Sequence, residues 1–262
     1  MNIYIPSSGR AGEQYTLRQI PQEWKAKTYL VVPESELHLY YHDAKVHRVG
    51  LLGCPHKGIG PTRQFIIAAA YPGKVCMLDD DLRFFKRRLD DRQKFADAFE
   101  ADVGKMLDTI ERSLEHMPFV GVCAREGGNR YPDRTYFNCR LLRVLAYRTE
   151  ILSKEGIRFD DIPVMEDFYV ALSLLTKGYS NLMLSDWCHN QRGSNDSGGC
   201  SQYRTMDVQK TAALKLQELF PDFVTVVTKT TKTAWGGQER TDVRVQWKQA
   251  FASSGGTVGT LD

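Results

Sequence analysis

Three consecutive carboxylates, Asp79, Asp80 and Asp81, directly follow the apolar run KVCML. A short apolar run of this kind predicts a buried strand, so the three side chains emerge together where the chain leaves the sheet. Such a density of negative charge is unfavourable unless a cation offsets it. Carboxylate oxygens suit Mg2+ or Mn2+, which would also neutralise the charge of a bound diphosphate. The alternative is that Asp81 caps a helix beginning at Leu82 and that the other two carboxylates are solvated.

Two further segments have the composition of a nucleotide or diphosphate site. In GCPHKGIGPTR, Gly60 and Arg63 lie about the start of a predicted helix, Thr62 to Ala70, where free amides and a cationic fork suit a diphosphate. The first two predicted strands end in polar turns, and the candidate binding residues there are Pro6, Ser7, Ser8, Gly9, Arg10 and Glu34. Taken singly, each segment is explained at least as well by a surface arginine or an ordinary turn.

Acid–base chemistry is the possible role of Glu166 and Asp167, in the first turn of a predicted helix. A carboxylate there is suited to deprotonating an attacking hydroxyl group. The helix dipole favours acidic residues at this place in any protein, and for the pair alone this is the stronger explanation. His189 follows a predicted strand, Asn181 to Leu184, and precedes a polar, glycine-rich run long enough to act as a lid. Metal ligation and a structural role explain this histidine equally well.

Two segments combine cations with aromatic residues, as nucleic-acid-binding surfaces do, because cations hold phosphates and aromatic rings stack on bases. In LRFFKRRL, the cations are Arg83, Lys86, Arg87 and Arg88. In CAREGGNRYPDRTYFNCR, the candidate contacts are Arg125, Arg130, Tyr131 and Arg134, with Arg140, Tyr136 and Phe137 nearby. The alternative is a solvated helix face with core aromatics, which is slightly favoured for the first segment and less so for the second.

These residues need a scaffold, and strands that alternate with helices predict an α/β sheet whose ligands gather beyond the carboxyl ends of the strands. The longest helix is expected over Gln93 to His116, from apolar residues at helical spacing. We expect one core domain over 1–200 and an extension over 201–262. The extension should contain a helix (Met206 to Phe220), strands (Phe223 to Lys229 and Val243 to Trp247) and a frayed tail.

Composition sets outer bounds. The chain has 262 residues, of which 42% are hydrophobic, and 35 basic against 32 acidic residues, so the net charge of +3 does not by itself indicate a polyanionic partner. The six cysteines form no CxxC pair, which favours reduced thiols over disulfides or zinc. Neither a signal peptide nor a membrane span is visible, so we expect a cytosolic protein without a membrane partner. The sequence does not predict an oligomeric state.

The order of these elements resembles that of GT-A nucleotide-sugar glycosyltransferases. A glycine-rich loop with Arg63, a strand ending in DDD, the segment GIRFDDIPVMEDFYVALSLLTKGY and a strand with His189 follow one another between Asn2 and about Gly199. The resemblance implies a mixed, mostly parallel Rossmann-like sheet flanked by helices. It also implies Asp79, Asp81 and His189 as ligands of Mn2+ or Mg2+, Asp80 as a donor-sugar or ribose contact, and Asp167, beside Glu166, as the catalytic base of an inverting enzyme.

The opening IYIPSSGRAGE and the segment MLDDDLRFFKR resemble, more narrowly, the phage-encoded glycosyltransferases associated with TET-type dioxygenases. This resemblance implies transfer of a sugar to 5-hydroxymethylcytosine in phage DNA within the host cytoplasm. The sequence does not identify the sugar or its nucleotide, and UDP is the commonest carrier in this superfamily. Two alternatives stay open. One is a GT-A enzyme acting on a carbohydrate, lipid or protein, and the other is a non-catalytic nucleotide or nucleic-acid binding module, which would need no ED pair.

Overall fold

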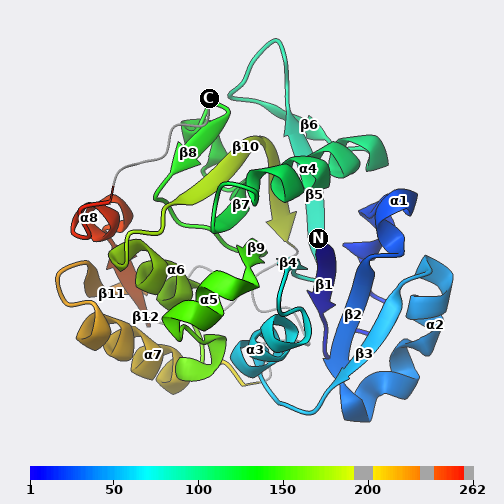
Figure 1. The fold of residues 1–262 in the computed structure, drawn as a ribbon, viewed down its shortest axis with the longest axis horizontal. Coiled ribbons are helices and arrows are strands. Elements are labelled where there is room, and N and C mark those ends of the chain that lie inside the picture. The colour runs from blue at the N-terminus through cyan, green and yellow to red at the C-terminus, as the bar shows by residue number, and fades with distance from the viewer. Residues whose placement is uncertain (192–202, 231–238, 257–262) are drawn as a thin grey trace.

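A mixed ten-stranded sheet with helices on both faces forms the centre of the molecule (Figure 1). This computed structural model describes residues 1–191, 203–230 and 239–256. The strands of the sheet are β1 (Asn2–Pro6), β2 (Thr28–Pro33), β3 (Gly50–Cys54), β4 (Lys74–Leu78), β5 (Leu82–Arg87), β6 (Phe95–Asp97), β7 (Phe119–Ala124), β8 (Thr135–Phe137), β9 (Val144–Arg148) and β10 (Asn181–Gln191). Their order is β3-β2-β1-β4-β9-β7-β10-β5-β6, and β8 pairs with β10 off this path.

Seven of these strands run in one direction, and β5, β8 and β9 run in the other. The mixed, mostly parallel sheet expected from the sequence is therefore confirmed. The carboxyl ends of β1 and β4 lie side by side, because the two strands pair in parallel from Asn2 opposite Val75 to Tyr4 opposite Met77. Parallel neighbours of this kind deliver the loops that follow them to the same edge of the sheet.

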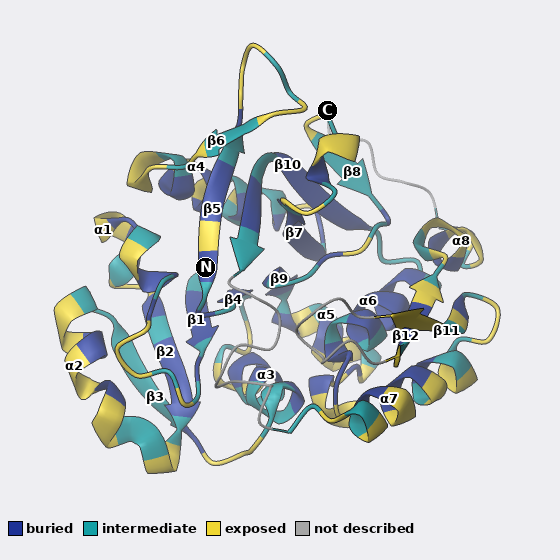
Figure 2. Ribbon diagram, turned by 180° about the vertical axis from the view of Figure 1, so that it is seen from behind, coloured by how far each residue is buried: buried dark blue, intermediate teal, exposed yellow. Residues whose placement is uncertain are grey.

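Two hydrophobic cores fill the space between the sheet and its helices, and side-chain alternation along the strands separates them. In β1, Ile3 and Ile5 face one core, and Tyr4 faces the other. The burial pattern appears in Figure 2, where the strands are largely buried and the outer helix faces are exposed. The helices of the first core are α1 (Gln22–Lys25), α2 (Leu37–His47) and α4 (Glu100–Ser113), and those of the second are α3 (Ile59–Ala69), α5 (Thr149–Glu155) and α6 (Glu166–Thr176).

The C-terminal extension forms a third cluster against α6. Its elements are α7 (Met206–Leu219), β11 (Val224–Thr230), β12 (Glu239–Val245) and α8 (Trp247–Ala252). Leu172 and Leu175 of α6 share this cluster with Leu216 of α7 and Phe251 of α8. The expected helix and first strand are confirmed, whereas the second strand ends at Val245 because the chain turns into α8. A division into domains at residue 200 stays a prediction.

After the acidic triplet, the alternative of a helix at Leu82 is wrong, and the expected long helix is present but shorter. Leu82 begins β5, which pairs with β10, so Asp81 does not cap a helix. The long helix expected from Gln93 begins instead at Glu100, where Asp102 accepts a hydrogen bond from the Phe99 amide at 3.0 Å. The preceding residues form β6, paired with β5. The apolar residues of β6 continue the helical spacing of α4, and for this reason the sequence predicted one longer helix.

Other boundaries also differ from expectation. The strand expected to end at Leu184 continues to Gln191 past a register shift, so His189 lies within β10 and not beyond it. The helix with Arg63 begins at Ile59, three residues before Thr62. The strand expected from Cys139 begins at Val144. The sequence reading missed η1 (Leu17–Gln19), η2 (Glu34–Glu36), η3 (Gly128–Arg130), η4 (Phe159–Asp161), α1, α2, α5, α8, β5, β6 and β8.

Several expectations concern residues outside the described ranges. These are the glycine-rich run proposed as a lid, most of which lies in 192–202, Cys200, and the end of the frayed tail, 257–262. The five cysteines within the described ranges are free thiols, as expected. Among the described helices, none combines the length and the apolar character that crossing a membrane requires.

Candidate active site

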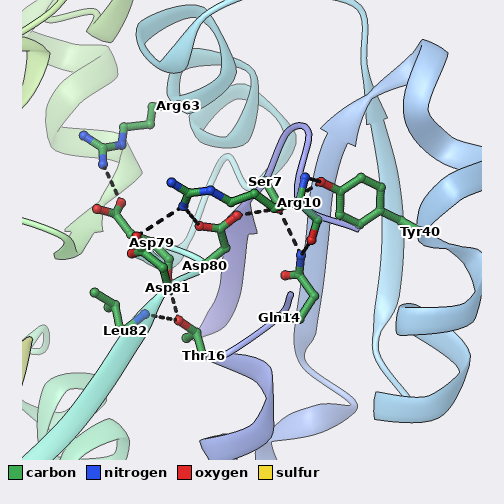
Figure 3. A network of polar contacts seen from close by, with 10 residues as sticks. All are labelled: Ser7, Arg10, Gln14, Thr16, Tyr40, Arg63, Asp79, Asp80, Asp81 and Leu82. Carbon is green, nitrogen blue, oxygen red and sulfur yellow. Dashed lines mark hydrogen bonds and ion pairs between the residues drawn. The ribbon is translucent and has the colours of Figure 1, made fainter. Parts of the chain in front are cut away.

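The loop after β1 and the acidic triplet after β4 are joined by one buried network (Figure 3). Asp80 accepts hydrogen bonds from the Ser7 hydroxyl and, at 2.7 Å, from Nη1 of Arg10. The same Arg10 nitrogen lies 3.2 Å from Oδ2 of Asp81. Asp80 is buried, and its hydrogen bonds to Ser7 and Arg10 hold the loop in place. Its predicted contact with a donor sugar stays a prediction.

Residues that the sequence reading did not single out complete this loop. The Tyr40 hydroxyl lies 3.1 Å from the Ser7 hydroxyl and accepts from the Arg10 amide at 2.9 Å. The Gln14 side-chain amide donates to Ser7 Oγ and to the Arg10 carbonyl. Two side chains from two different segments therefore help to fix the turn, although nothing in their local sequence distinguishes them.

The outer part of the turn depends on Glu36 and not on the predicted Glu34. Glu36 accepts from the Ser8 hydroxyl at 2.9 Å and from the Gly9 amide at 2.7 Å. Glu34 is exposed, and within the described ranges no hydrogen bond or ion pair is recorded for it. Pro6 ends β1 immediately before this turn. The expected donor-binding segment is therefore present as one structured loop, with Glu34 set apart from it.

Thr16 fixes the backbone of the acidic triplet. Its hydroxyl donates to the Asp79 carbonyl at 2.6 Å and accepts from the Leu82 amide at 2.9 Å, and its amide donates to the Asp80 carbonyl. On the other side, the Asp79 amide donates to the carbonyl of Arg143 at 3.1 Å. The triplet is thus held rigidly by its main chain, which leaves its side-chain oxygens for other contacts.

Arg63 connects the triplet with the predicted catalytic pair. One guanidinium nitrogen lies 3.1 Å from Oδ1 of Asp79 and the other lies 2.5 Å from Oε1 of Glu166. Helix α3 comes close to η4 to reach this position, because a Cβ at Gly60 would lie 2.7 Å from the carbonyl oxygen of Phe159. Gly60 is therefore required for packing, and its predicted role in donor binding stays a prediction.

The site carries more negative than positive charge. Five carboxylates gather around three guanidinium groups; they are Asp79, Asp80, Asp81, Glu166 and Asp167 with Arg10, Arg63 and Arg143. Glu126, Arg140 and Arg204 also act electrostatically on members of this group. Burial and the neighbouring carboxylates raise the pKa of Asp81 to about 6, and burial also raises the pKa of Asp79 and of Glu166. A divalent cation would offset carboxylates gathered in this way.

Asp79 and Asp81 fit two positions of a metal site. The Asp79 side chain is 30% exposed, against 6% for Asp80, so its carboxylate is the more open one. In Mg2+ and Mn2+ sites that serve diphosphates, one or two carboxylates commonly suffice, and phosphate and water oxygens complete the coordination. Within the described residues, no three His, Cys, Asp or Glu side chains lie close enough together to hold a metal ion by themselves.

His189 has the chemistry of a ligand but is not joined to the carboxylates in a closed cluster. Burial, with the charge of Arg143, lowers its pKa to about 3, so the imidazole is neutral near pH 7. Neither ring nitrogen has a hydrogen-bond partner in the described part of the chain, although the carbonyls of Val122 and Leu142 are near. A buried imidazole with both nitrogens unsatisfied is unusual. Its predicted metal role stays a prediction.

Of the predicted catalytic pair, Asp167 is the carboxylate available for proton transfer. Glu166 is buried and its carboxylate is bound to Arg63. Asp167 is partly exposed in the first turn of α6 and close enough to Asp79 to raise the pKa of that residue. Arg143, which the sequence reading missed, lies near Asp79 and Asp81 with a left-handed φ of 63°. Such backbone outliers cluster at functional sites.

The first basic segment is part of the fold. Arg87 is buried and donates to the carbonyls of Ser185, Arg92 and Gly128. The other cations of this segment are each paired with an acid: Arg83 with Asp97, Lys86 with Asp102 and Arg88 with Asp90. Phe84 and Phe85 are core residues, so the alternative of core aromatics holds, although on a strand and not on a helix.

The second basic segment is largely exposed. The guanidinium carbon of Arg125 lies 4.2 Å from the Phe85 ring centroid, and the Arg125 amide donates to the carbonyl of His189 at 2.8 Å. Arg130 is exposed, and Tyr131 packs edge-on against Tyr136. Arg134 is 78% exposed but lies 3.5 Å from Asp186. The segment therefore offers cations and aromatic rings to solvent close to β10.

Comparison with known proteins places this geometry in context. Curated relatives from Enterobacteria phages T2 and T6, both named Beta-glucosyl-HMC-alpha-glucosyl-transferase, are 24% identical over 238 residues, which is 85% of this chain and 82% of theirs. Glucosyl-3-phosphoglycerate synthase of Mycobacterium tuberculosis, solved with Mn2+, UDP-glucose and phosphoglyceric acid, shares the fold at a TM-score of 0.51 and 13% identity, with 95% of this chain and 90% of that chain covered.

The same synthase solved with Mg2+ and UDP gives a TM-score of 0.50 at 12% identity, over 93% of this chain and 86% of that one. The expected GT-A fold is thereby confirmed. The sequence model of the TET-Associated Glycosyltransferase family matches residues 1–199, which includes both strand-end loops, α3 and α6. Since this match spans well over half of the 262 residues, the chain belongs to the TET-associated glycosyltransferase family and is a glycosyltransferase.

Proposed function

We propose that this glycosyltransferase moves a sugar from a UDP-sugar to the hydroxyl group of 5-hydroxymethylcytosine in phage DNA, with a divalent cation. The observation that carries the donor half is the group of carboxylates gathered around Arg10, Arg63 and Arg143 beside the carboxyl ends of β1 and β4. The acceptor half rests on the relatives of phages T2 and T6, whose name states glucosyl transfer to an HMC derivative.

In the donor site, Asp79 and Asp81 would hold the cation together with the diphosphate. A bound Mn2+ or Mg2+ offsets the charge that develops on the departing diphosphate. The loop from Pro6 to Arg10 lies at the end of β1, where nucleotides bind in open α/β sheets. Its rigid hydrogen bonds position the nucleotide in advance, which reduces the entropy lost on binding.

In the acceptor site, Asp167 would take the proton of the attacking hydroxyl group. Arg63 holds the neighbouring Glu166 in an ion pair, so Asp167 is the carboxylate of the pair that stays open to solvent. A base in this place needs a heavy-atom distance of about 2.6–3.2 Å to the acceptor oxygen. A base that assists a single displacement from the side opposite the diphosphate inverts the anomeric centre.

A second acceptor is favoured by the relatives' name. The acceptor in the name of those enzymes is β-glucosyl-HMC, which is a hydroxymethylcytosine that already carries a sugar. On this alternative the attacking hydroxyl group belongs to the attached sugar and not to the base, so the enzyme would act after another transferase.

One experiment separates these acceptors. The protein is incubated with UDP-sugars, Mn2+ and three DNA duplexes that contain cytosine, 5-hydroxymethylcytosine or β-glucosyl-5-hydroxymethylcytosine, and the nucleosides are analysed by mass spectrometry. We expect a mass gain of one hexose on the second duplex. A gain on the third duplex alone would support the alternative, and a gain on small saccharides but on no DNA would overturn both.

A further inference from the structure

A groove of about 560 Å³ lies between the second basic segment and the C-terminal extension. One wall comes from the chain around β8 and the other from the start of α8. The groove residues used below are Arg130, Tyr131, Tyr136, Arg140, Trp247 and Lys248. The family match ends at residue 199, so the wall from α8 lies outside it.

The charge of this groove has one sign. Arg130, Arg140 and Lys248 line it, and no Asp or Glu does. In the described part of the chain none of these three cations forms an ion pair, in contrast to Arg83 and Arg134, which are paired with acids. Cations that no carboxylate neutralises can bind phosphate groups.

Flat apolar surfaces lie on both walls. Tyr131 and Tyr136 meet at right-angled packing with ring centroids 5.0 Å apart. On the opposite wall, the half-buried Trp247 packs against Phe168 with centroids 5.5 Å apart. Aromatic rings held in this way provide stacking surfaces for nucleotide bases, each worth about 1–3 kcal/mol.

The groove borders the start of α6. The guanidinium carbon of Arg140 lies 4.4 Å from the centroid of Phe168, which directly follows Asp167 in the first turn of α6. Phe168 also contacts Trp247, so residues of both walls pack on the helix that carries the candidate base. The groove and the candidate base are therefore joined through the first turn of α6.

We infer that this groove holds the DNA strand next to the modified nucleotide, with phosphates on Arg130, Arg140 and Lys248 and a base against Trp247 or Tyr131. This inference rests on the proposed function and assigns the C-terminal extension a role in it. The core alone supplies one wall, and α8 completes the clamp, so DNA binding requires the part of the chain beyond the family match.

The test uses the double variant Arg140→Gln/Lys248→Gln and the control Lys210→Gln, an exposed lysine of α7 that does not line the groove. Affinity for a 5-hydroxymethylcytosine duplex is measured over a range of salt concentrations. Transfer to the free nucleoside 5-hydroxymethyl-2′-deoxycytidine is measured separately, because a nucleoside carries no flanking phosphate.

We expect the double variant to bind DNA at least about tenfold more weakly than the wild-type protein. The slope of log affinity against log salt concentration should become less steep by about two, because each lost phosphate contact removes nearly one unit from its magnitude. Nucleoside transfer and the control should be unchanged. A slope equal to that of the control would overturn the inference, as would equal loss of nucleoside transfer. If these changes abolish self-association or the binding of a protein while DNA binding persists, the groove has another occupant and the inference is wrong.

The proposed function and this inference fail separately. If the wild-type protein never modifies hydroxymethylated DNA but its salt slope falls in the double variant, the groove binds DNA and the acceptor assignment is wrong. If transfer to hydroxymethylated DNA occurs with an unchanged slope, the acceptor assignment stands and the groove inference is wrong.

Discussion

At the scale of single residues, Arg63 has the most demanding position. It is buried and contacts Asp79, from the acidic triplet, and Glu166, 103 positions later in the chain. The guanidinium group therefore compensates two carboxylates, of which Glu166 is buried and Asp79 is partly exposed. Its removal should affect folding as well as catalysis, because a buried charge without a partner is strongly unfavourable.

We predict that Arg63→Ala lowers the free energy of unfolding by about 3–5 kcal/mol, the usual cost of breaking a buried ion pair. Arg158→Ala is the control, since its exposed ion pair with Asp160 should contribute at most about 1 kcal/mol. Urea denaturation followed by circular dichroism measures both values. Equal effects of the two changes would show that the buried pair is not the cause.

The stereochemistry of transfer tests the role of Asp167. If its carboxylate deprotonates the acceptor hydroxyl in a single displacement, an α-linked donor gives a β-linked product, and Asp167→Asn should lower kcat by about 10²–10⁴. NMR coupling at the anomeric proton reads the product directly. The relatives of phages T2 and T6 are named α-glucosyl transferases. An α-linked product from an α-linked donor would contradict both the single displacement and the role of Asp167 as its base.

At the scale of elements, sequence periodicity located strands and helices that are bounded by strong local signals. The strands at Lys74–Leu78 and Phe119–Ala124 and the start of the helix at Glu166 have the expected positions. The edge strand β6 was not found because its pairing with β5 is set by tertiary contact, while Phe95 and Phe99 happen to continue the helical spacing of α4. Tertiary strand pairing of this kind overrides the secondary structure that the local spacing of apolar residues predicts.

Close packing between α3 and η4 gives a prediction at this scale. A Cβ at Gly60 would lie 2.7 Å from a backbone oxygen, which cannot move cheaply, whereas a Cβ at Gly104 in α4 would meet the flexible Glu23 side chain at 2.9 Å. We expect Gly60→Ala to destabilise the protein by about 1–3 kcal/mol. Gly104→Ala should be neutral or stabilising by up to about 1 kcal/mol. Thermal unfolding of both variants decides the matter, and a neutral Gly60→Ala would contradict the packing.

At the scale of the whole molecule, the site gathers segments that the chain keeps far apart. Charge motifs pointed to Asp79, Arg63 and Glu166, because each follows a strand or begins a helix. Thr16, Glu36 and Tyr40 could not be found in this way, since they act through contacts with segments 27 to 66 residues distant in sequence. Their residue types are common in any surface loop, so only the fold assigns them.

Ligand linkage provides a prediction for the whole molecule. A ligand that binds only the folded protein stabilises it by about 2.7 kcal/mol at 100 times its Kd. We therefore expect UDP and Mn2+ together to raise Tm by several degrees, and UDP with a chelator to raise it much less. Asp81→Asn should abolish most of the joint effect, and transfer should cease after exhaustive chelation. Full turnover without a divalent cation would contradict the metal assignment.

Arg10 has a consequence for the order in which ligands bind. In this structure it already neutralises Asp80 and Asp81, as an internal substitute for a positively charged ligand. A metal ion alone must compete with that guanidinium group for Asp81, whereas a diphosphate that attracts Arg10 releases the carboxylate. Each ligand therefore prepares the site for the other, and reciprocity requires the same factor in both directions. Under the proposed metal assignment, the metal ion and the nucleotide would therefore bind together more tightly than either binds alone.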